Sequence, residues 1–203
     1  FAARGMDARD MVTFDRVSEP TLSPDGKTVV YGLRKVDYAA HKSTTGFWKQ
    51  SLNSKQAAVR VTAPELNVNS PVFSSDGQTL YFLSSKSGSM QLWMQSLAGG
   101  DAMRISDYPL DIGSYKISPD GKAVVLSLEV FNDCADLACT KKRLDAEDAS
   151  KATGSLYDKL FIRHWDTWAD GRRNQLFNAG FSADGKLVGE PKKITSGIDG
   201  DVP

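Results

Sequence analysis

Short apolar runs alternate with polar, turn-forming residues along most of the chain, and this pattern predicts β-structure. The runs hold three or four residues and are rich in valine, leucine, tyrosine and phenylalanine, as in Val29–Tyr31, Leu80–Leu83 and Val124–Leu126. Side chains of these types are typical of strands, and turn-forming residues precede each run. We therefore expect an all-β fold.

One six-residue motif recurs three times and organises this pattern. It reads Leu22-Ser-Pro-Asp-Gly-Lys27, then Phe73-Ser-Ser-Asp-Gly-Gln78, then Ile117-Ser-Pro-Asp-Gly-Lys122, and its aspartates lie 51 and then 44 residues apart. In the full motif, proline presets the backbone at the second turn position, aspartate tolerates the third, and glycine takes the positive φ that ends the turn. Each copy therefore predicts a β-hairpin.

A second element follows each hairpin and completes a repeating unit. Phe47–Leu52 and Leu92–Leu97 match closely, Gln175–Gly180 is a looser copy, and each precedes a closing run that ends in threonine or serine. Four antiparallel strands in each unit of roughly 40 to 50 residues are the signature of a propeller blade. We expect about three such blades, over residues 15–62, 68–106 and 112–195.

The third blade differs from the others, and the set of blades is incomplete. An insertion is expected over residues 131–173, with a short helix in Lys141–Ser150 because that segment is rich in helix formers. The Asp-Gly within Phe181–Lys186 is expected to be an inner turn of this same blade. Because propellers close with about four to eight blades, three form only a partial propeller. We expect the chain to be the amino-terminal part of a longer protein.

The amino-acid composition argues against a disordered chain, a nucleic-acid binder and a membrane protein. The 203 residues carry 25 basic and 25 acidic side chains, and 40% of them are hydrophobic, which is too apolar for a disordered chain. The balanced charge disfavours a nucleic-acid partner, since such binders show a basic excess or stripe. Apolar runs all fall short of the roughly 20 residues that cross a bilayer, so no membrane partner is expected.

The two cysteines, Cys134 and Cys139, lie close together and leave three states open. They can form a local disulfide in an oxidising compartment, remain free thiols, or contribute to a metal site. Zinc would need further ligands, and His41 and His164 are far off in sequence, so we expect the disulfide, no metal and no cofactor. The chain begins at Phe1, which we interpret as processing or trimming, and a removed secretory signal would agree with a disulfide.

One constellation carries candidate chemistry, in Arg163-His164-Trp165-Asp166-Thr167-Trp168. On a strand, His164, Asp166 and Trp168 would share one face, and Asp166 beside an indole could hold a cationic amine. The alternative is structural: the two tryptophans pack between blades while Arg163 and Asp166 fix the insertion by hydrogen bonds. No catalytic signature is complete, because the sequence has no Gly-x-Ser-x-Gly, no phosphate loop and no His-Glu-x-x-His. We expect no catalytic residue in this chain.

The repeated turns and the Leu160–Trp168 segment together resemble a known family. They are similar to the TolB-like repeats of prolyl-oligopeptidase-family propellers, and to dipeptidyl-peptidase 5 and acylaminoacyl-peptidase-like enzymes in particular. The resemblance implies a propeller of seven or eight blades that caps an α/β-hydrolase domain bearing a Ser–Asp–His triad, which this chain lacks. Some relatives bind the substrate amine through paired glutamates; no Glu-Glu occurs here, and Asp166 or Glu129 are the acidic residues that could substitute.

The resemblance implies a function for the parent protein and leaves an alternative from another class. As part of a periplasmic or secreted serine exopeptidase, the chain would gate short peptides, and Arg163, His164, Trp165, Asp166 and Trp168 would form subsite walls. Its partners would be peptide substrates, the remaining blades and the hydrolase domain, with a homodimer possible. The alternative is a non-catalytic TolB-like propeller that binds a protein partner in the periplasm.

Overall fold

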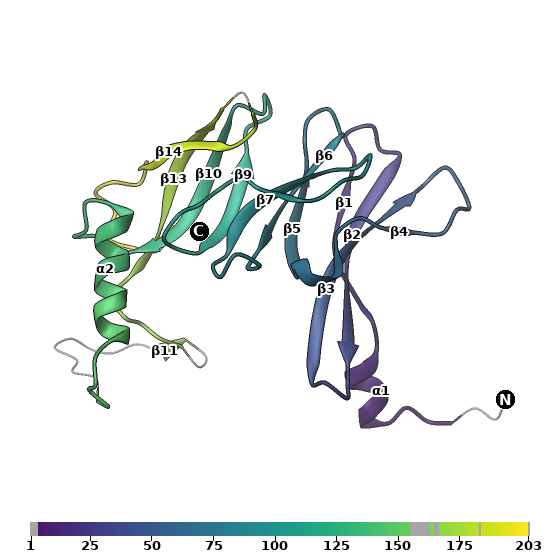
Figure 1. Ribbon diagram of the computed structural model, residues 1–203, viewed down its shortest axis with the longest axis horizontal. Helices are drawn as coiled ribbons and strands as arrows, with labels where there is room; N and C mark the ends of the chain where they lie inside the picture. The colour runs from purple at the N-terminus through teal and green to yellow at the C-terminus, as the bar shows by residue number, and fades with distance from the viewer. Residues whose placement is uncertain (1–3, 155–162, 165–166, 183, 203) are drawn as a thin grey trace. The chain divides into compact units, whose positions relative to one another are not determined.

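The computed structural model describes residues 4–154, 163–164, 167–182 and 184–202. Its strands form three four-stranded antiparallel sheets, which confirms the predicted all-β, propeller-like class (Figure 1). The chain divides into two compact units, one mainly Phe1–Asp107 and the other mainly residues 108–203, and each is described here by itself.

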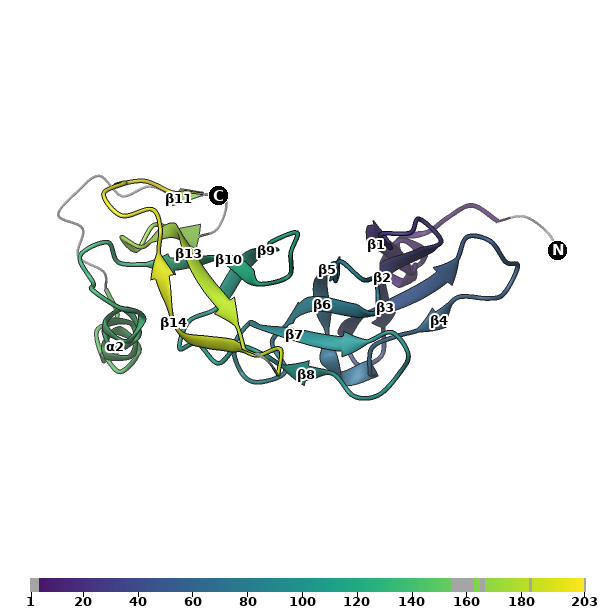
Figure 2. The ribbon, with the colours of Figure 1, turned by 90° about the horizontal axis from the view of Figure 1, so that it is seen from above.

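The first unit contains two of the sheets, and each keeps its strands in sequence order (Figure 2). They lie within the ranges 15–62 and 68–106 that the repeat predicts for two blades. A short helix, α1 (Ala8–Thr13), precedes them, and a 3₁₀ turn, η1 (Pro64–Leu66), connects them. The strands are β1 (Arg16–Leu22), β2 (Thr28–Asp37), β3 (Lys42–Ser51) and β4 (Val59–Arg60), then β5 (Val68–Phe73), β6 (Thr79–Ser84), β7 (Gln91–Ser96) and β8 (Met103–Arg104).

The Asp-Gly motif forms the predicted turn between the first two strands of each sheet. In the first copy, the Gly26 amide donates to the Ser23 carbonyl at 2.9 Å, and Gly26 takes φ +68°. The Ser23 hydroxyl donates to Asp25 at 2.7 Å and accepts from the Thr28 amide at 2.9 Å. Asp25 also accepts from the Lys27 amide at 3.0 Å, so its carboxylate is committed to the turn.

The core of the first unit lies between the two sheets. Val30 on β2 and Phe47 on β3 are fully buried against Leu80 and Phe82 on β6. The rings of Phe47 and Phe82 meet edge to face, with centroids 5.8 Å apart, a geometry that aromatic pairs prefer. The side of the first sheet that carries Val30 and Phe47 is therefore its covered face.

A buried hydroxyl at the end of each closing run ties the run to the third strand. The Thr62 hydroxyl accepts from the Phe47 amide at 2.9 Å in the first sheet. In the second sheet, Ser106 accepts from the Leu92 amide at 2.8 Å and donates to the buried Gln91 side chain at 2.7 Å. The hydroxyls thus pair the backbone amides of Phe47 and Leu92, because β4 and β8 end before they reach these positions.

The second unit holds the third sheet, whose order is β14-β13-β10-β9. Its core includes Leu126 and Leu128 on β10 and Phe177 on β13. The Phe181–Lys186 segment connects β13 to β14, which confirms that it is an inner turn of the same sheet. The strands are β9 (Ile112–Ile117), β10 (Ala123–Val130), β13 (Arg173–Phe181) and β14 (Leu187–Lys193).

The insertion between β10 and β13 contains a helix, α2 (Leu137–Asp148), and two short strands, β11 (Arg163–His164) and β12 (Thr167–Trp168). The predicted helix over Lys141–Ser150 exists but begins four residues earlier. Asp136 explains the difference, because its side chain accepts from the Cys139 amide at 2.7 Å and caps the helix.

Candidate functional site

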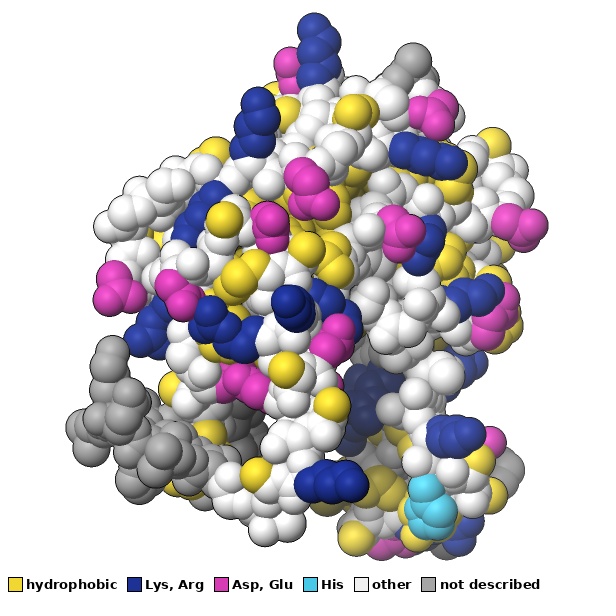
Figure 3. All heavy atoms as spheres, turned by 60° about the vertical axis from the view of Figure 1, so that its left-hand side comes forward, with side chains coloured by type: hydrophobic (Ala, Val, Ile, Leu, Met, Phe, Trp, Pro, Cys, Tyr) yellow, Lys and Arg dark blue, Asp and Glu magenta, His cyan; other side chains and the backbone are white. Residues whose placement is uncertain are grey.

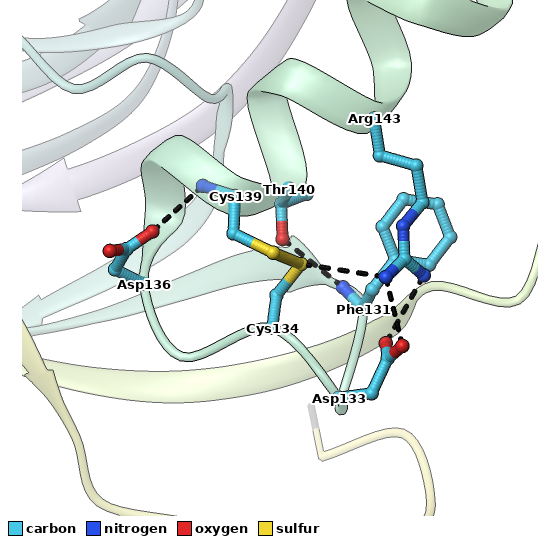
Figure 4. Close-up of a disulfide and its surroundings, with 7 residues drawn as sticks. All are labelled: Phe131, Asp133, Cys134, Asp136, Cys139, Thr140 and Arg143. Carbon is cyan, nitrogen blue, oxygen red and sulfur yellow. Dashed lines mark hydrogen bonds and ion pairs between the residues drawn. A yellow bond between two sulfur atoms is a disulfide. The ribbon is translucent and has the colours of Figure 1, made fainter.

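The insertion carries the residues that the sequence singles out, and a compact cluster anchors it to the end of β10. Cys134 and Cys139 form a disulfide across the first turn of α2, so the structure has the first of the three states open to these cysteines (Figure 4). Arg143, two turns along the helix, pairs with both oxygens of Asp133 at 3.1 and 2.8 Å. Its guanidinium also lies 4.2 Å from the ring centroid of Phe131.

Two buried residues of α2 also hold this anchoring cluster in place. The fully buried Thr140 hydroxyl accepts from the Phe131 amide at 3.3 Å, and Leu137 is buried beside it. The rest of α2 is mostly exposed or partly exposed, as its polar composition predicts. The cluster therefore fixes the first turns of α2 to the third sheet and leaves the far end of the helix toward solvent.

The cluster shifts the pKa of an acid that the sequence did not single out. The hydrogen bonds from Arg143 hold the pKa of Asp133 below its usual value, and the Asp133 carboxylate in turn raises the pKa of Arg143. Elsewhere in the second unit, burial and the nearby charge of Glu190 raise the pKa of Tyr108 to about 12. Both shifts move the pKa of the group away from neutral, whereas a general acid or base works best with a pKa near the operating pH.

A second polar group lies where the insertion returns to the sheet. Arg172 donates to Asp170 at 2.7 Å and pairs with Glu129 of β10 at 3.1 Å. Asp170 also accepts from the Arg172 amide at 2.9 Å, and Gly171 between them takes φ +94° beside the Phe131 ring. Glu129, which the sequence offered as an amine-binding acid, is therefore paired with an arginine and helps hold the base of the insertion.

The candidate segment from Arg163 to Trp168 is not one continuous strand. Arg163 lies directly opposite Trp168, and His164 opposite Thr167, in an antiparallel pair. The alternation of faces expected along a single strand therefore does not apply, because the chain reverses direction within the segment. Trp165 and Asp166 lie outside the described residues, and so does any contact that they make.

Trp168 is the member of this segment whose side chain the structure describes, and it is 44% exposed. An exposed indole can contact a ligand through its apolar face and donate a hydrogen bond through its ring N–H. The geometry thus leaves Trp168 accessible at the hairpin, whose strands are β11 and β12.

A separate hollow of about 490 Å³ lies between the Asp-Gly turns of the two sheets in the first unit, lined in part by Asp25, Lys49 and Asp76. Its acids are already engaged: hydrogen bonds from Ser23 and Ser74 are the main cause of the lowered pKa of Asp25 and of Asp76. Lys49 donates to the Leu97 carbonyl at 2.7 Å. The hollow is therefore bordered by groups that hold the turns and the sheets in place.

Surface charge, metal-ligating residues and helix hydropathy complete the description of the candidate sites. Basic and acidic side chains are interspersed over the face drawn in Figure 3, in keeping with the formal net charge of zero. Over the described ranges, no cluster of three or more histidine, cysteine or acidic residues is placed to hold a metal. None of the helices in that part of the chain is both long and apolar enough to cross a membrane.

Comparison with known proteins identifies relatives of this fold. No family model matches the chain. Dipeptidyl-peptidase 5 from Porphyromonas gingivalis is 33% identical over 160 residues, which cover 78% of this chain and 22% of that protein. Among solved structures, an acylaminoacyl peptidase from Pyrococcus horikoshii matches 91% of this chain and 26% of its own, with a TM-score of 0.56 and 14% identity. TolB from Agrobacterium tumefaciens matches 93% of this chain and 53% of its own, with a TM-score of 0.50 and 18% identity.

The identity to dipeptidyl-peptidase 5 establishes the family of this chain, and the likeness to the two solved structures supports the fold. The chain spans about a quarter of the length of the curated relatives it matches, so the match concerns one portion of those proteins. In this chain the region consists of four-stranded antiparallel sheets, and an Asp-Gly turn joins the first two strands of each sheet. The chain is therefore a propeller portion related to those of prolyl-oligopeptidase-family peptidases.

Proposed function

We propose that this chain is the access-controlling propeller portion of a secreted or periplasmic serine exopeptidase that cleaves short peptides. The observation that carries the proposal is the 33% identity to a dipeptidyl-peptidase 5 over 78% of the chain. The parent protein would release dipeptides or acyl-amino acids through an acyl-enzyme, with the catalytic serine on a hydrolase domain outside this chain.

Within that function, the chain would bind and orient peptide rather than react with it. The accessible Trp168 at the β11–β12 hairpin would supply an apolar contact for the substrate, and Arg163, His164, Trp165 and Asp166 are the neighbouring candidates. Asp133, Arg143, Glu129 and Arg172 would act indirectly, by holding the insertion that carries the hairpin on the third sheet.

The test uses the purified full-length parent protein, a dipeptidyl chromogenic substrate and a serine-directed covalent inhibitor. We expect turnover that the inhibitor abolishes. To test the role of the hairpin, Trp168→Ala should raise KM several-fold with little change in kcat. Tyr38→Ala is a matched control, because Tyr38 is an aromatic residue of similar exposure, 46%, in the first unit. Turnover that the inhibitor does not affect, or no turnover, would contradict the proposal.

A second candidate function is a non-catalytic propeller that binds a protein partner in the cell envelope. The likeness to TolB, with a TM-score of 0.50, favours it as the alternative. The coding sequence downstream of this chain separates the two candidates. A Gly-x-Ser-x-Gly motif after the last blade supports the peptidase, whereas a stop codon directly after the last blade supports the binding module.

A further inference from the structure

The disulfide between Cys134 and Cys139 lies at the start of the insertion, and its two sulfur atoms have different surroundings (Figure 4). Both cysteines are partly exposed, so the bond is open to a small molecule in solution. We propose that this disulfide is a site of reversible modification by a small anionic thiol of the glutathione class, in which Cys139 is attacked and Cys134 is the sulfur that leaves. The inference does not depend on the proposed function.

Cys134 has a cation beside its sulfur. The Nη2 atom of Arg143 lies 3.8 Å from the Cys134 sulfur and donates a hydrogen bond to it. The same guanidinium pairs with both oxygens of Asp133 and lies against the Phe131 ring, so its position is fixed before any bond breaks. A nearby positive charge stabilises a thiolate, and a stabilised thiolate is the better leaving group in thiol–disulfide exchange. Cys134 is therefore suited to leave.

Cys139 has an acid as its neighbour instead. The carboxylate of Asp136 accepts from the Cys139 amide at 2.7 Å, so a negative charge on the Cys139 sulfur would be repelled by that carboxylate. Asp133 is next to Cys134 in the sequence, but Arg143 already pairs with its charge. Cys139 is therefore the sulfur that stays in a neutral disulfide, first with Cys134 and then with the incoming thiol.

One lysine of α2 supplies a charge that would attract the incoming thiol. Lys142 stands three residues after Cys139, a spacing that brings two side chains together on the surface of a helix. Lys142 is exposed and makes no ion pair within the described part of the chain, whereas Lys141 pairs with Asp145. A free surface cation raises the local concentration of an anion, and a thiol that carries carboxylates is such an anion.

The exchange needs no oxidant or reductant besides the thiol itself. The incoming thiolate forms a bond to the Cys139 sulfur while the bond between Cys139 and Cys134 breaks, and the electron pair of the broken bond stays on Cys134 as a thiolate. One disulfide replaces another, so the protein and the thiol together gain and lose no electrons. Attack of the Cys134 thiolate on Cys139 restores the original bond and releases the small thiol, which makes the modification reversible.

The fold around the disulfide has other attachments that hold when the bond opens. The Thr140 hydroxyl accepts from the Phe131 amide, and Leu137 is buried, so the first turns of α2 stay on the sheet. The two cysteines are only five positions apart, and the stabilisation that a cross-link adds grows with the length of the loop it closes. Opening the bond would therefore loosen the connection between β10 and α2 and leave the sheet folded.

The first experiment locates the attacked sulfur in the full-length parent protein. The oxidised protein is mixed with reduced glutathione, quenched with acid at timed intervals, alkylated and cleaved before Asp136, which separates the two cysteines for mass spectrometry. We expect a glutathione adduct on Cys139 and an alkylated Cys134. An adduct mainly on Cys134, or no adduct on either cysteine, would overturn the proposal.

Two variants of one ion pair distinguish this chemistry from simple loosening of the helix. Arg143→Gln and Asp133→Asn both remove the pair, so loosening alone would speed exchange in both. We expect opposite effects instead: Arg143→Gln slows exchange several-fold because the leaving thiolate loses its cation, and Asp133→Asn speeds it because the guanidinium is no longer shared. Arg143→Lys, which keeps the charge, should recover much of the rate. Changes in the same direction in Arg143→Gln and Asp133→Asn would contradict the assignment of Cys134 as the leaving sulfur.

The charge of the thiol is tested with a third variant. Lys142→Gln should slow exchange with glutathione, which is anionic, and should not slow exchange with cysteamine, which is cationic. Lys141→Gln is the matched control, because Lys141 is the adjacent lysine and is already paired with Asp145. If Lys142→Gln slows both thiols equally, or does not slow glutathione more than the control does, the preference for an anionic thiol is wrong.

Discussion

The smallest features that hold this protein together are buried hydroxyls, each shared between a closing run and the strand beside it. Ser106 is the clearest case, because it accepts from the Leu92 amide and donates to the buried Gln91 side chain. Thr195 makes the corresponding bonds with Leu176 and Gln175, at 3.1 and 2.7 Å. One hydroxyl therefore satisfies two buried polar groups that no regular strand pairing reaches.

We predict that Ser106→Ala lowers the free energy of unfolding by about 1–3 kcal/mol, since it leaves the Leu92 amide and the Gln91 carbonyl oxygen buried without this partner. Urea denaturation followed by circular dichroism measures the change. Ser85→Ala serves as the control, because Ser85 is exposed on the β6–β7 loop and its loss should change stability by less than about 0.5 kcal/mol. A Ser106→Ala protein as stable as the control would show that the hydroxyl contributes nothing.

At the scale of elements, the ion pair between Arg143 and Asp133 adds a pH-dependent contribution to the anchoring of the insertion, beside the disulfide and the buried Thr140. Because Arg143 lowers the pKa of Asp133 in the folded state, the pair stabilises the protein above the unfolded aspartate pKa of about 3.9. That contribution is lost as the pH falls through the lower, folded pKa. The loss should loosen the anchoring of α2 and leave the three sheets unaffected, while the disulfide and the buried Thr140 still hold the first turns of the helix.

We therefore predict that Asp133→Asn reduces the thermal unfolding midpoint of the insertion at pH 7 and that the difference from wild type shrinks as the pH falls below the unfolded aspartate pKa of about 3.9. A spectroscopic probe at the far end of α2 would follow the insertion separately from the sheets. Asp148→Asn, at the last residue of the same helix, is the charge-matched control. A difference that persists unchanged in strong acid would mean that the Asp133 side chain acts through packing and not through its charge.

The sequence predicts elements well where turn chemistry marks them. The three Asp-Gly turns mark where the first strand of each sheet ends and the second begins, and in the first copy the side chains of Ser23 and Asp25 are hydrogen-bonded within the turn. The start of α2 also had a signal, since Asp136 is a favoured cap residue, but the helix-forming composition farther along concealed it. The β11–β12 hairpin had none, because two-residue strands are too short to show a period.

Burial is the property that the sequence could not provide, and it is decided at the scale of the whole molecule. Val17 and Val68 are the same residue type at equivalent places in the repeat, yet one is exposed and the other lies in the core. The difference depends on whether a neighbouring sheet is present, which no local pattern records. For the same reason the accessibility of Trp168 had to come from the structure.

When the chain is produced without the rest of the parent protein, one face of its first sheet exposes apolar side chains to water. Val17 and Leu22 lie on one face of an edge strand, and such surfaces drive association in water. We predict that the isolated 203-residue chain forms concentration-dependent assemblies, which static light scattering would detect as a mass above 22.1 kDa. Leu22→Asp should shift the protein toward the monomer, because it places a charge on the face that assembly would bury, and Val59→Asp should not. A wild-type chain that stays monomeric at all concentrations would mean that this face is compatible with water, and that the sheet needs no neighbour in order to be soluble.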